Sequence, residues 1–179
     1  MRVSTPVYIG IGSNISPEEN IPEALRKLIA AGLVSDRKPI LISNHYETPA
    51  IGKPEDPQFI NGVWHFATLV SFKELKAALN AIESELGRKR VEDPYAPREI
   101  DLDILLFGAL IDKKNKLPDP DIYKRKFVYL PLLELSPDLR IPGDEKPLAE
   151  IVDTAQNGMV VSPLTEKLKQ IALEEANEY

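Results

Sequence analysis

Two amphipathic helix patterns alternate with strand-like segments, and this order constrains the fold more than any other feature of the chain. Apolar residues at helical spacing predict one helix that ends near residue 31 and another over residues 71–86. Segments rich in β-branched and aromatic residues predict strands at 7–9, 40–48, 59–68 and 101–107. Residues 1–107 therefore follow the order β-α-β-β-α-β.

This order predicts an α+β fold of the ferredoxin-like type, which is an antiparallel sheet with two helices on one face. A chain of 179 residues has room for one domain. We expect a single domain over residues 1–179, with its core at 7–142. The extension 143–179, which contains an amphipathic helix pattern, is expected to be a C-terminal appendage.

The ends of the two helices differ in clarity. Ser71 and Glu74 form a capping box that begins the second helix. The first helix has two possible caps. A start at Ser16 would leave Pro22 inside the helix, where proline removes a hydrogen bond. We therefore favour a start at Asn20, or a kinked first turn.

The composition excludes several classes of protein. Without cysteine the chain has no disulfides, thiolate metal sites or cysteine nucleophiles. The net charge of −6 argues against broad nucleic-acid binding, and no apolar run approaches the ~20 residues of a membrane span. The first residues lack the apolar core of a secretion signal. We expect a cytoplasmic protein without nucleic-acid or membrane partners.

Two carboxylates stand at the start of the last predicted strand. Asp101 and Asp103 are two residues apart, so on a strand both side chains point to the same face. Such carboxylates suit Mg²⁺, which often takes one or two of them and completes its shell with water and phosphate oxygens. The alternative is a solvent-facing side of a strand, because acidic and apolar residues alternate here. Spacing alone leaves both interpretations open.

Basic residues near this pair favour a phosphate site. Arg88 and Arg90 follow the second helix, and Arg98 precedes the two carboxylates. Arginine binds phosphate oxygens through two parallel hydrogen bonds, and acidic metal ligands opposite arginines are typical of phosphoryl transfer. For Arg88 and Arg90 alone, the alternative is cations that stabilise a helix C-terminus. The chain has no P-loop motif, and Gly10-Ile11-Gly12 is only a weak glycine signal.

Other candidates carry less information. His45 and His65 lack the spacing of metal ligands, which favours packing or surface roles, and Trp64 is expected in the core. The segment 49–58 holds three prolines and is longer than a normal hairpin turn. Loops that exceed the structural minimum often carry function.

Five short segments, taken together and in this order, carry a family resemblance. They are Tyr8-Ile9-Gly10-Ile11-Gly12-Ser13-Asn14, Tyr46-Glu47-Thr48-Pro49, Gln58-Phe59-Ile60-Asn61, Gly87-Arg88 through Pro97-Arg98-Glu99-Ile100-Asp101-Leu102-Asp103-Ile104-Leu105-Leu106-Phe107-Gly108, and Phe127-Val128-Tyr129-Leu130-Pro131-Leu132. The fourth segment is the most specific. With these segments the chain resembles the 6-hydroxymethyl-7,8-dihydropterin pyrophosphokinases of folate biosynthesis over residues 7–142.

The resemblance implies a ferredoxin-like fold, ATP and two Mg²⁺ ions. It implies transfer of the β,γ-diphosphate of ATP to the hydroxymethyl oxygen of the pterin, with release of AMP. The family's catalytic positions are matched by Arg88, Arg98, Asp101 and Asp103, and the two aspartates match its metal ligands. Its ATP-binding positions are matched by Glu83, Arg88, Arg90, Tyr95, Arg98, Ile104, Asp119 and Arg125. Its pterin pocket is matched by Thr48, Pro49, Ile51, Phe59, Asn61, Asp101 and Phe127.

The chain departs from the family at three positions. Asp119 stands where many members have a histidine near the nucleotide, and its charge would repel phosphate unless a metal or Arg125 offsets it. Tyr95 replaces a frequent loop tryptophan, and Asn80 stands where glutamine is sometimes found. None of these changes removes Arg98 or the acidic pair.

These departures leave more than one function open. We expect small-molecule partners and a monomer or weak homodimer. One alternative is a related Mg²⁺-ATP transferase that acts on another alcohol. The other is a ferredoxin-like module that senses a ligand or RNA. RNA binding predicts a basic sheet face with exposed aromatic residues, and the net charge of −6 and the acidic pair on the fourth strand count against it.

Overall fold

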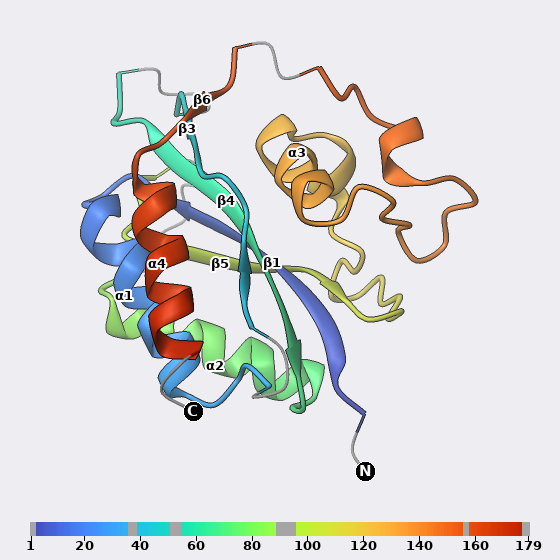
Figure 1. Cartoon of the computed structure of the whole chain (residues 1–179), viewed down its shortest axis with the longest axis horizontal. Coiled ribbons are helices and arrows are strands. Elements are labelled where there is room, and N and C mark those ends of the chain that lie inside the picture. Colours follow the sequence, from blue (N-terminus) through green and yellow to red (C-terminus); the bar gives the residue numbers. More distant parts are fainter. Residues whose placement is uncertain (1–2, 36–38, 51–54, 89–95, 156–157, 177–179) are drawn as a thin grey trace.

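Figure 1 shows the computed structural model of the chain, which describes residues 3–35, 39–50, 55–88, 96–155 and 158–176. In chain order the elements are β1 (Thr5–Ser13), α1 (Pro17–Ala30), β2 (Leu41–Ile42), β3 (Tyr46–Thr48), β4 (Phe59–Thr68), α2 (Phe72–Glu85), β5 (Asp101–Phe107), the 3₁₀ turn η1 (Pro120–Tyr123), α3 (Lys126–Leu135), the 3₁₀ turn η2 (Leu148–Glu150), β6 (Val160–Val161) and α4 (Leu164–Ala176). Among these described helices, none combines the length and the apolar character that crossing a membrane requires.

The strands form one sheet in which every neighbouring pair is antiparallel, as predicted. Their order is β5-β1-β4-β3-β6, and β2 pairs with a further part of β4. The predicted strand 40–48 is divided into β2 and β3. At the division the Ser43 hydroxyl accepts a hydrogen bond from the Val63 N–H at 2.9 Å, so a side chain takes the place of a main-chain carbonyl in the ladder.

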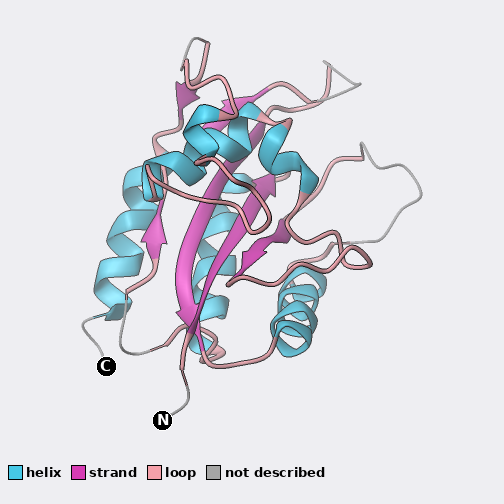
Figure 2. Ribbon diagram, turned by 90° about the vertical axis from the view of Figure 1, so that its right-hand side faces the viewer, coloured by secondary structure: helices cyan, strands magenta, loops and turns pink. Residues whose placement is uncertain are grey.

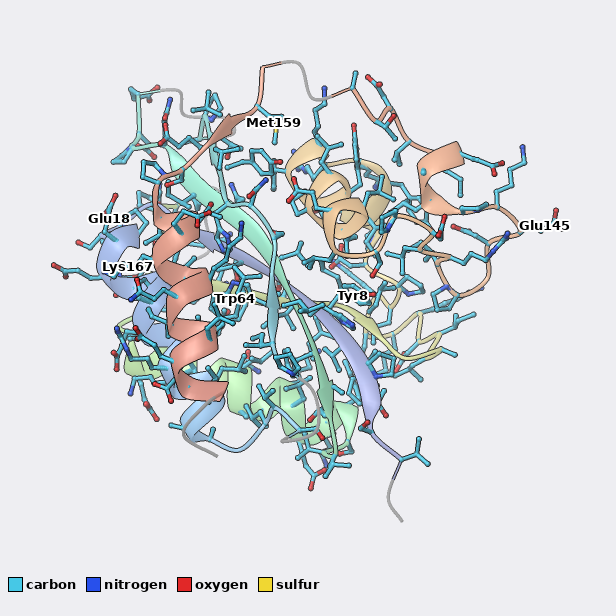
Figure 3. All side chains as sticks on the ribbon, viewed as in Figure 1. Tyr8, Glu18, Trp64, Glu145, Met159 and Lys167 are labelled. Atoms are coloured by element: carbon cyan, nitrogen blue, oxygen red, sulfur yellow. The ribbon has the colours of Figure 1, made fainter. Side chains whose placement is uncertain are left out.

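Both faces of the sheet are covered. α1, α2 and α4 pack on the face that carries the buried Trp64, whereas α3 and the two 3₁₀ turns lie over the face that carries Tyr8 (Figures 1 and 3). Figure 2, seen from the α3 side, shows α3 passing in front of the strands. The prediction of helices on one face was therefore incomplete, because the apolar segment around Leu132 forms a second layer against Val63 and Leu106.

A β-bulge in β5 explains why its sequence changes from alternating to continuously apolar. The extra residue is Leu105, where the register against β1 shifts. Before the bulge, Asp101 and Asp103 face the α3 side and Leu102 faces the helix side. At and beyond it, Leu105 and Leu106 both join the core under α3. Alternation places Leu105 on the face of the acidic pair, and the bulge adds the next residue, Leu106, to the same face.

The first helix begins earlier than predicted. It starts directly after Ser16, which has a left-handed conformation (φ 42°) and makes no side-chain capping bond. Pro22 lies inside the helix and cannot donate to the Glu18 carbonyl. Lys167 of α4 donates to that carbonyl instead, at 3.2 Å (Figure 3). A tertiary contact therefore replaces the lost bond, and the predicted start at Asn20 was wrong.

The C-terminal segment is part of the core instead of an appendage. β6 pairs with β3, and Leu168 and Ile171 of α4 are buried with residues of α1 and α2. The main chain of His45 joins the two parts. Its N–H donates to Thr165 Oγ1 at 2.9 Å, and its carbonyl accepts from the Ser162 N–H at 2.7 Å.

The ring of His45 is a neutral part of the core. Nδ1 donates to the Ser43 carbonyl at 3.1 Å, and Nε2 accepts from Trp64 Nε1 at 3.2 Å. The ring lies against Gly62, where a Cβ atom would come within 2.6 Å of it. Burial lowers the pKa of His45 to about 4. This placement confirms the packing role expected for His45 and the core position expected for Trp64.

The buried histidine predicts a loss of stability on acidification. Its pKa is about 4 in the folded chain and ~6.5 when unfolded, so the neutral ring stabilises the fold above pH ~6.5 and this contribution is lost as the pH falls toward 4. Between pH 7 and 4 the unfolding free energy should fall by about 3 kcal/mol more in the wild type than in His45→Gln, whose amide oxygen can still accept from Trp64. Urea titrations check this, and equal losses would contradict it.

Candidate active site

A pocket of about 360 Å³ opens on the α3 side of the sheet. Gly10 and Gly12 of β1 belong to its lining, and a Cβ atom at Gly12 would come within 2.9 Å of Asn61 Oδ1. Glycine here lets a ligand approach the main chain closely. The complete lining is Gly10, Ile11, Gly12, Thr48, Pro49, Phe59, Asn61, Gly62, Arg98, Asp101, Asp103, Leu105, Asp119, Asp121, Arg125, Phe127 and Val128.

Asp101 is the centre of an ion-pair network at this pocket. Its Oδ1 lies 2.7 Å from Nη1 of Arg88, and its Oδ2 pairs with Arg98. Arg88 also pairs with Glu83 of α2, whose side chain is almost fully buried. Glu83 Oε1 accepts from the Leu102 N–H at 2.7 Å. Burial raises the pKa of Glu83, while this hydrogen bond and Arg88 act in the opposite direction. The network fixes the end of α2 to the start of β5.

Asp103 has a strongly perturbed carboxyl group. Burial and the negative charges of Asp101, Asp119 and Glu83 raise its pKa to about 7, against the effect of Arg88. Its side chain is exposed to the solvent of the pocket, so the neighbouring carboxylates contribute more to this rise in pKa than burial does. Within the described part of the chain, no three metal-ligating side chains gather in one place. A metal would therefore depend on the acidic pair and on oxygen atoms of a ligand.

Another part of the pocket is aromatic and uncharged. Phe59 of β4 and Phe127 at the start of α3 both line it, together with Pro49. Asn61 Nδ2 donates to Thr48 Oγ1 at 2.7 Å, and both side chains are nearly buried. This bond fixes the orientation of the amide. A flat ring with polar edges matches such a combination of aromatic faces and one oriented amide.

Asp119 is engaged with the main chain of η1. Its Oδ1 accepts from the Asp121 N–H at 2.8 Å. Burial raises the pKa of Asp119. This hydrogen bond and the charges of Lys116 and Lys124 offset only part of the rise. Nε of Arg125 lies 3.8 Å from Oδ1 of Asp121. The charge of Asp119 is thus offset in part by lysines, while Arg125 balances an aspartate that the sequence analysis did not consider.

The pocket brings together most of the predicted site residues. Glu83 and Arg88 are absent from the lining and reach it through Asp101. The side chain of Ile104 packs against the helix-side core and is absent from the pocket lining. Three predicted residues lie outside the part of the chain that the structure describes: Ile51, Arg90 and Tyr95.

Sequence reasoning missed several lining residues, among them Gly12, Asp121, Leu105 and Val128. Gly12 carried a signal, because two glycines two residues apart on a strand leave one face of it bare. Asp121 carried none, since its position in the pocket depends on the path of η1 between β5 and α3.

The comparison with known proteins agrees with this geometry. The sequence model of 7,8-dihydro-6-hydroxymethylpterin-pyrophosphokinase (HPPK) matches residues 8–137, a range that contains every residue of the pocket lining. The chain belongs to the HPPK family. It is 39% identical over 149 residues to the 2-amino-4-hydroxy-6-hydroxymethyldihydropteridine pyrophosphokinase of Pseudomonas aeruginosa, which covers 82% of this chain and 89% of that HPPK.

Proteins of the same name from other bacteria give similar values. The HPPK of Aquifex aeolicus is 37% identical over 147 residues, which cover 80% of this chain and 88% of that protein. The HPPK of Haemophilus influenzae is 34% identical over 141 residues, which cover 77% of this chain and 86% of that protein. The matches therefore include nearly the whole length of these relatives.

The crowded carboxylates predict that the protein gains stability when Asp103 loses its charge. The pKa of Asp103 is raised to about 7, so its protonated form favours folding and that contribution is lost as the pH rises toward and beyond 7. In EDTA, Asp103→Asn should melt a few degrees above the wild type at pH 8, a gain of about 1 kcal/mol after allowance for solvent screening, and the gain should be less than half as large at pH 5.

Asp138→Asn serves as the matched control in these melting curves. It removes the same charge from an exposed turn outside the pocket lining. An Asp103→Asn protein that melts below the wild type at pH 8, or a gain equal to that of Asp138→Asn, would contradict the crowding.

Proposed function

We propose that this protein transfers the β,γ-diphosphate of ATP to the hydroxymethyl group of 6-hydroxymethyl-7,8-dihydropterin and releases AMP, a step of folate biosynthesis. One observation carries the proposal: a single pocket joins an aromatic, amide-bearing part to an acidic pair with arginines. A flat ring with a hydroxymethyl arm suits the first part and a polyphosphate with its cations suits the second. The relatives from Pseudomonas aeruginosa, Aquifex aeolicus and Haemophilus influenzae are named as pyrophosphokinases of this pterin, which supports the same substrates.

The aromatic part is suited to hold a pterin ring. Heteroaromatic rings stack on phenyl faces such as those of Phe59 and Phe127, and a good aromatic pair contributes ~0.5–1.5 kcal/mol beyond its area. Because Nδ2 of Asn61 is bonded to Thr48, the Oδ1 atom is the part of this amide that can accept from a ring N–H. The bare main chain of Gly12 leaves room for the ring beside that oxygen.

The acidic pair fits Mg²⁺. Asp101 and Asp103 share one face of β5, and the raised pKa of Asp103 reflects negative charge that a cation would neutralise. We propose that these two carboxylates hold two Mg²⁺ ions, with phosphate oxygens and water as the remaining ligands. When bound, Mg²⁺ would reduce the negative charge on the transferred and departing phosphates.

The protein's own part in the reaction is positioning and charge balance. The hydroxymethyl oxygen forms a bond to Pβ while the bond between Pβ and the oxygen bridging to Pα breaks. AMP keeps that oxygen and its electron pair, and the hydroxyl proton passes to solvent. A loose transition state of this kind needs no strong base. Arg88 and Arg98, which share Asp101 here, can turn their guanidinium groups toward phosphate oxygens.

Finer features of the molecule also belong to this proposal. For the β-α-β-β-α-β part, the strand order β5-β1-β4-β3 supports a ferredoxin-like topology. The burial of α4 against α1 supports one domain over residues 1–179. A monomer or weak homodimer and a cytoplasmic location stay predictions, and the use of ATP as a substrate favours the latter.

AMP release should require ATP, Mg²⁺ and the hydroxymethyl pterin together. Chromatography of reactions that lack one component, or that contain EDTA, measures this directly. Asp103→Ala, folded but inactive, is the control for a contaminating kinase. AMP formation that does not change on addition of pterin would contradict the proposal. Release with a different primary alcohol would favour the related transferase, and pterin binding without AMP would favour a sensor.

Removal of the Arg98 guanidinium should depress turnover more than nucleotide binding. In Arg98→Ala we expect kcat to fall by about 10²–10³-fold, because the group stabilises charge that develops in the transition state, while the KM for ATP changes by less than about threefold. Arg26→Ala, which removes an exposed arginine of α1, is the control and should leave both constants unchanged. Equal losses of kcat and ATP binding would mean that Arg98 only holds ground-state ATP.

A further inference from the structure

Asn14, directly after β1, is a buried side chain to which the proposed chemistry gives no role. Only 4% of its surface is exposed, and it is not part of the pocket lining. A buried amide without partners costs ~1–3 kcal/mol, so its hydrogen bonds are informative. Asn14 finds them in two segments that lie far away in the sequence and that both lead into the pocket.

The first of these segments contains Arg98, whose main chain is held by the side-chain oxygen and by the main-chain N–H of Asn14. Asn14 Oδ1 accepts from the Arg98 N–H at 2.8 Å, and the Asn14 N–H donates to the Arg98 carbonyl at 3.1 Å. The neighbouring Ser13 hydroxyl donates to the Glu99 carbonyl at 2.6 Å. The main chain of Arg98 is therefore anchored to the end of β1. This anchor determines which positions the guanidinium group can reach.

The second segment leads into the aromatic part of the pocket. Asn14 Nδ2 donates to the Pro57 carbonyl at 3.1 Å, two residues before Phe59. One planar amide thus serves as acceptor for the arginine segment and as donor for the segment before β4. Aspartate has the same shape but lacks the donor, and alanine lacks both groups.

We propose that Asn14 is a positioning residue for the diphosphate transfer, which sets the place of the Arg98 guanidinium relative to the aromatic part of the pocket. This inference rests on the proposed function. Arg98 pairs with Asp101 in this structure, and the same anchored main chain would present it to the phosphates of a bound nucleotide. Without the amide only the Asn14 and Ile15 N–H bonds to the Arg98 carbonyl remain, so the Arg98 N–H loses its partner and the main chain can shift. A misplacement of ~1 Å can cost about 100-fold in rate.

Steady-state kinetics of two variants test the role. In Asn14→Ala we expect kcat to fall by about 10–100-fold, with the KM for ATP within about threefold of the wild type and a higher KM for the pterin. Asn14→Asp keeps the oxygen that accepts from Arg98, so its kcat should stay within about fivefold of the wild type. An Asn14→Ala kcat within threefold of the wild type, or a lower kcat in Asn14→Asp than in Asn14→Ala, would overturn the proposal.

A double-mutant cycle separates positioning from general loosening of the fold. If Asn14 acts through Arg98, Asn14→Ala should lower kcat by less than about threefold in an Arg98→Ala background. Losses that multiply in full would overturn the role. Asn20→Ala is the matched control. The Asn20 amide lies in the first turn of α1 and also bonds to the segment after β1, because it donates to the Ile15 carbonyl at 2.7 Å. It should leave kcat unchanged.

Amide hydrogen exchange tests the anchor without any assay of activity. The Arg98 N–H should exchange about tenfold faster in Asn14→Ala than in the wild type or Asn20→Ala. Unchanged protection would overturn the anchor, even if the wild type releases no AMP. AMP release by the wild type together with an unchanged kcat in Asn14→Ala would overturn the positioning role and leave the proposed function standing.

Discussion

The shared carboxylate of Asp101 is the interaction on which the site depends. Arg88 and Arg98 both pair with it, and Arg88 is held in turn by the buried Glu83 at the end of α2. Loss of one partner of a buried pair costs ~3–5 kcal/mol, because the other charge stays behind without compensation. Charge balance therefore sets α2, β5 and the segment of Arg98 relative to one another, and it holds both arginines beside the acidic pair.

The two faces of the sheet divide the work. On the helix face, residues such as Ile9 and Trp64 are packed without exposure, which supplies most of the hydrophobic stabilisation. On the α3 face, Gly10 and Gly12 leave the main chain of β1 bare, and β5 presents acidic side chains before its bulge at Leu105. The larger hydrophobic core and the candidate active site thus lie on opposite sides of the same strands.

The pocket contains more negative charge than the fold would favour by itself. Neighbouring carboxylates and burial raise the pKa of Asp103 to about 7, and burial raises the pKa of Asp119. Such sites are common where a protein binds cations or performs chemistry, because the same groups that destabilise the empty pocket attract its ligand. The lysines near Asp119 and the pairing of Arg125 with Asp121 limit the repulsion among the acidic residues of the pocket.

The sequence by itself determined the local elements and the nature of the site. Periodicity predicted β4 and α2 with its Ser71 cap, because alternation and capping are local properties. A two-residue spacing on a strand sufficed to place Asp101 and Asp103 on one face. Only the tertiary structure decided that α1 begins after Ser16 and that α3 covers a second face of the sheet. It also decided that Glu83 pairs with Arg88 and that Asn14 anchors the main chain of Arg98. These features depend on contacts between residues far apart in the chain, and such contacts follow from register and packing, which no local pattern specifies.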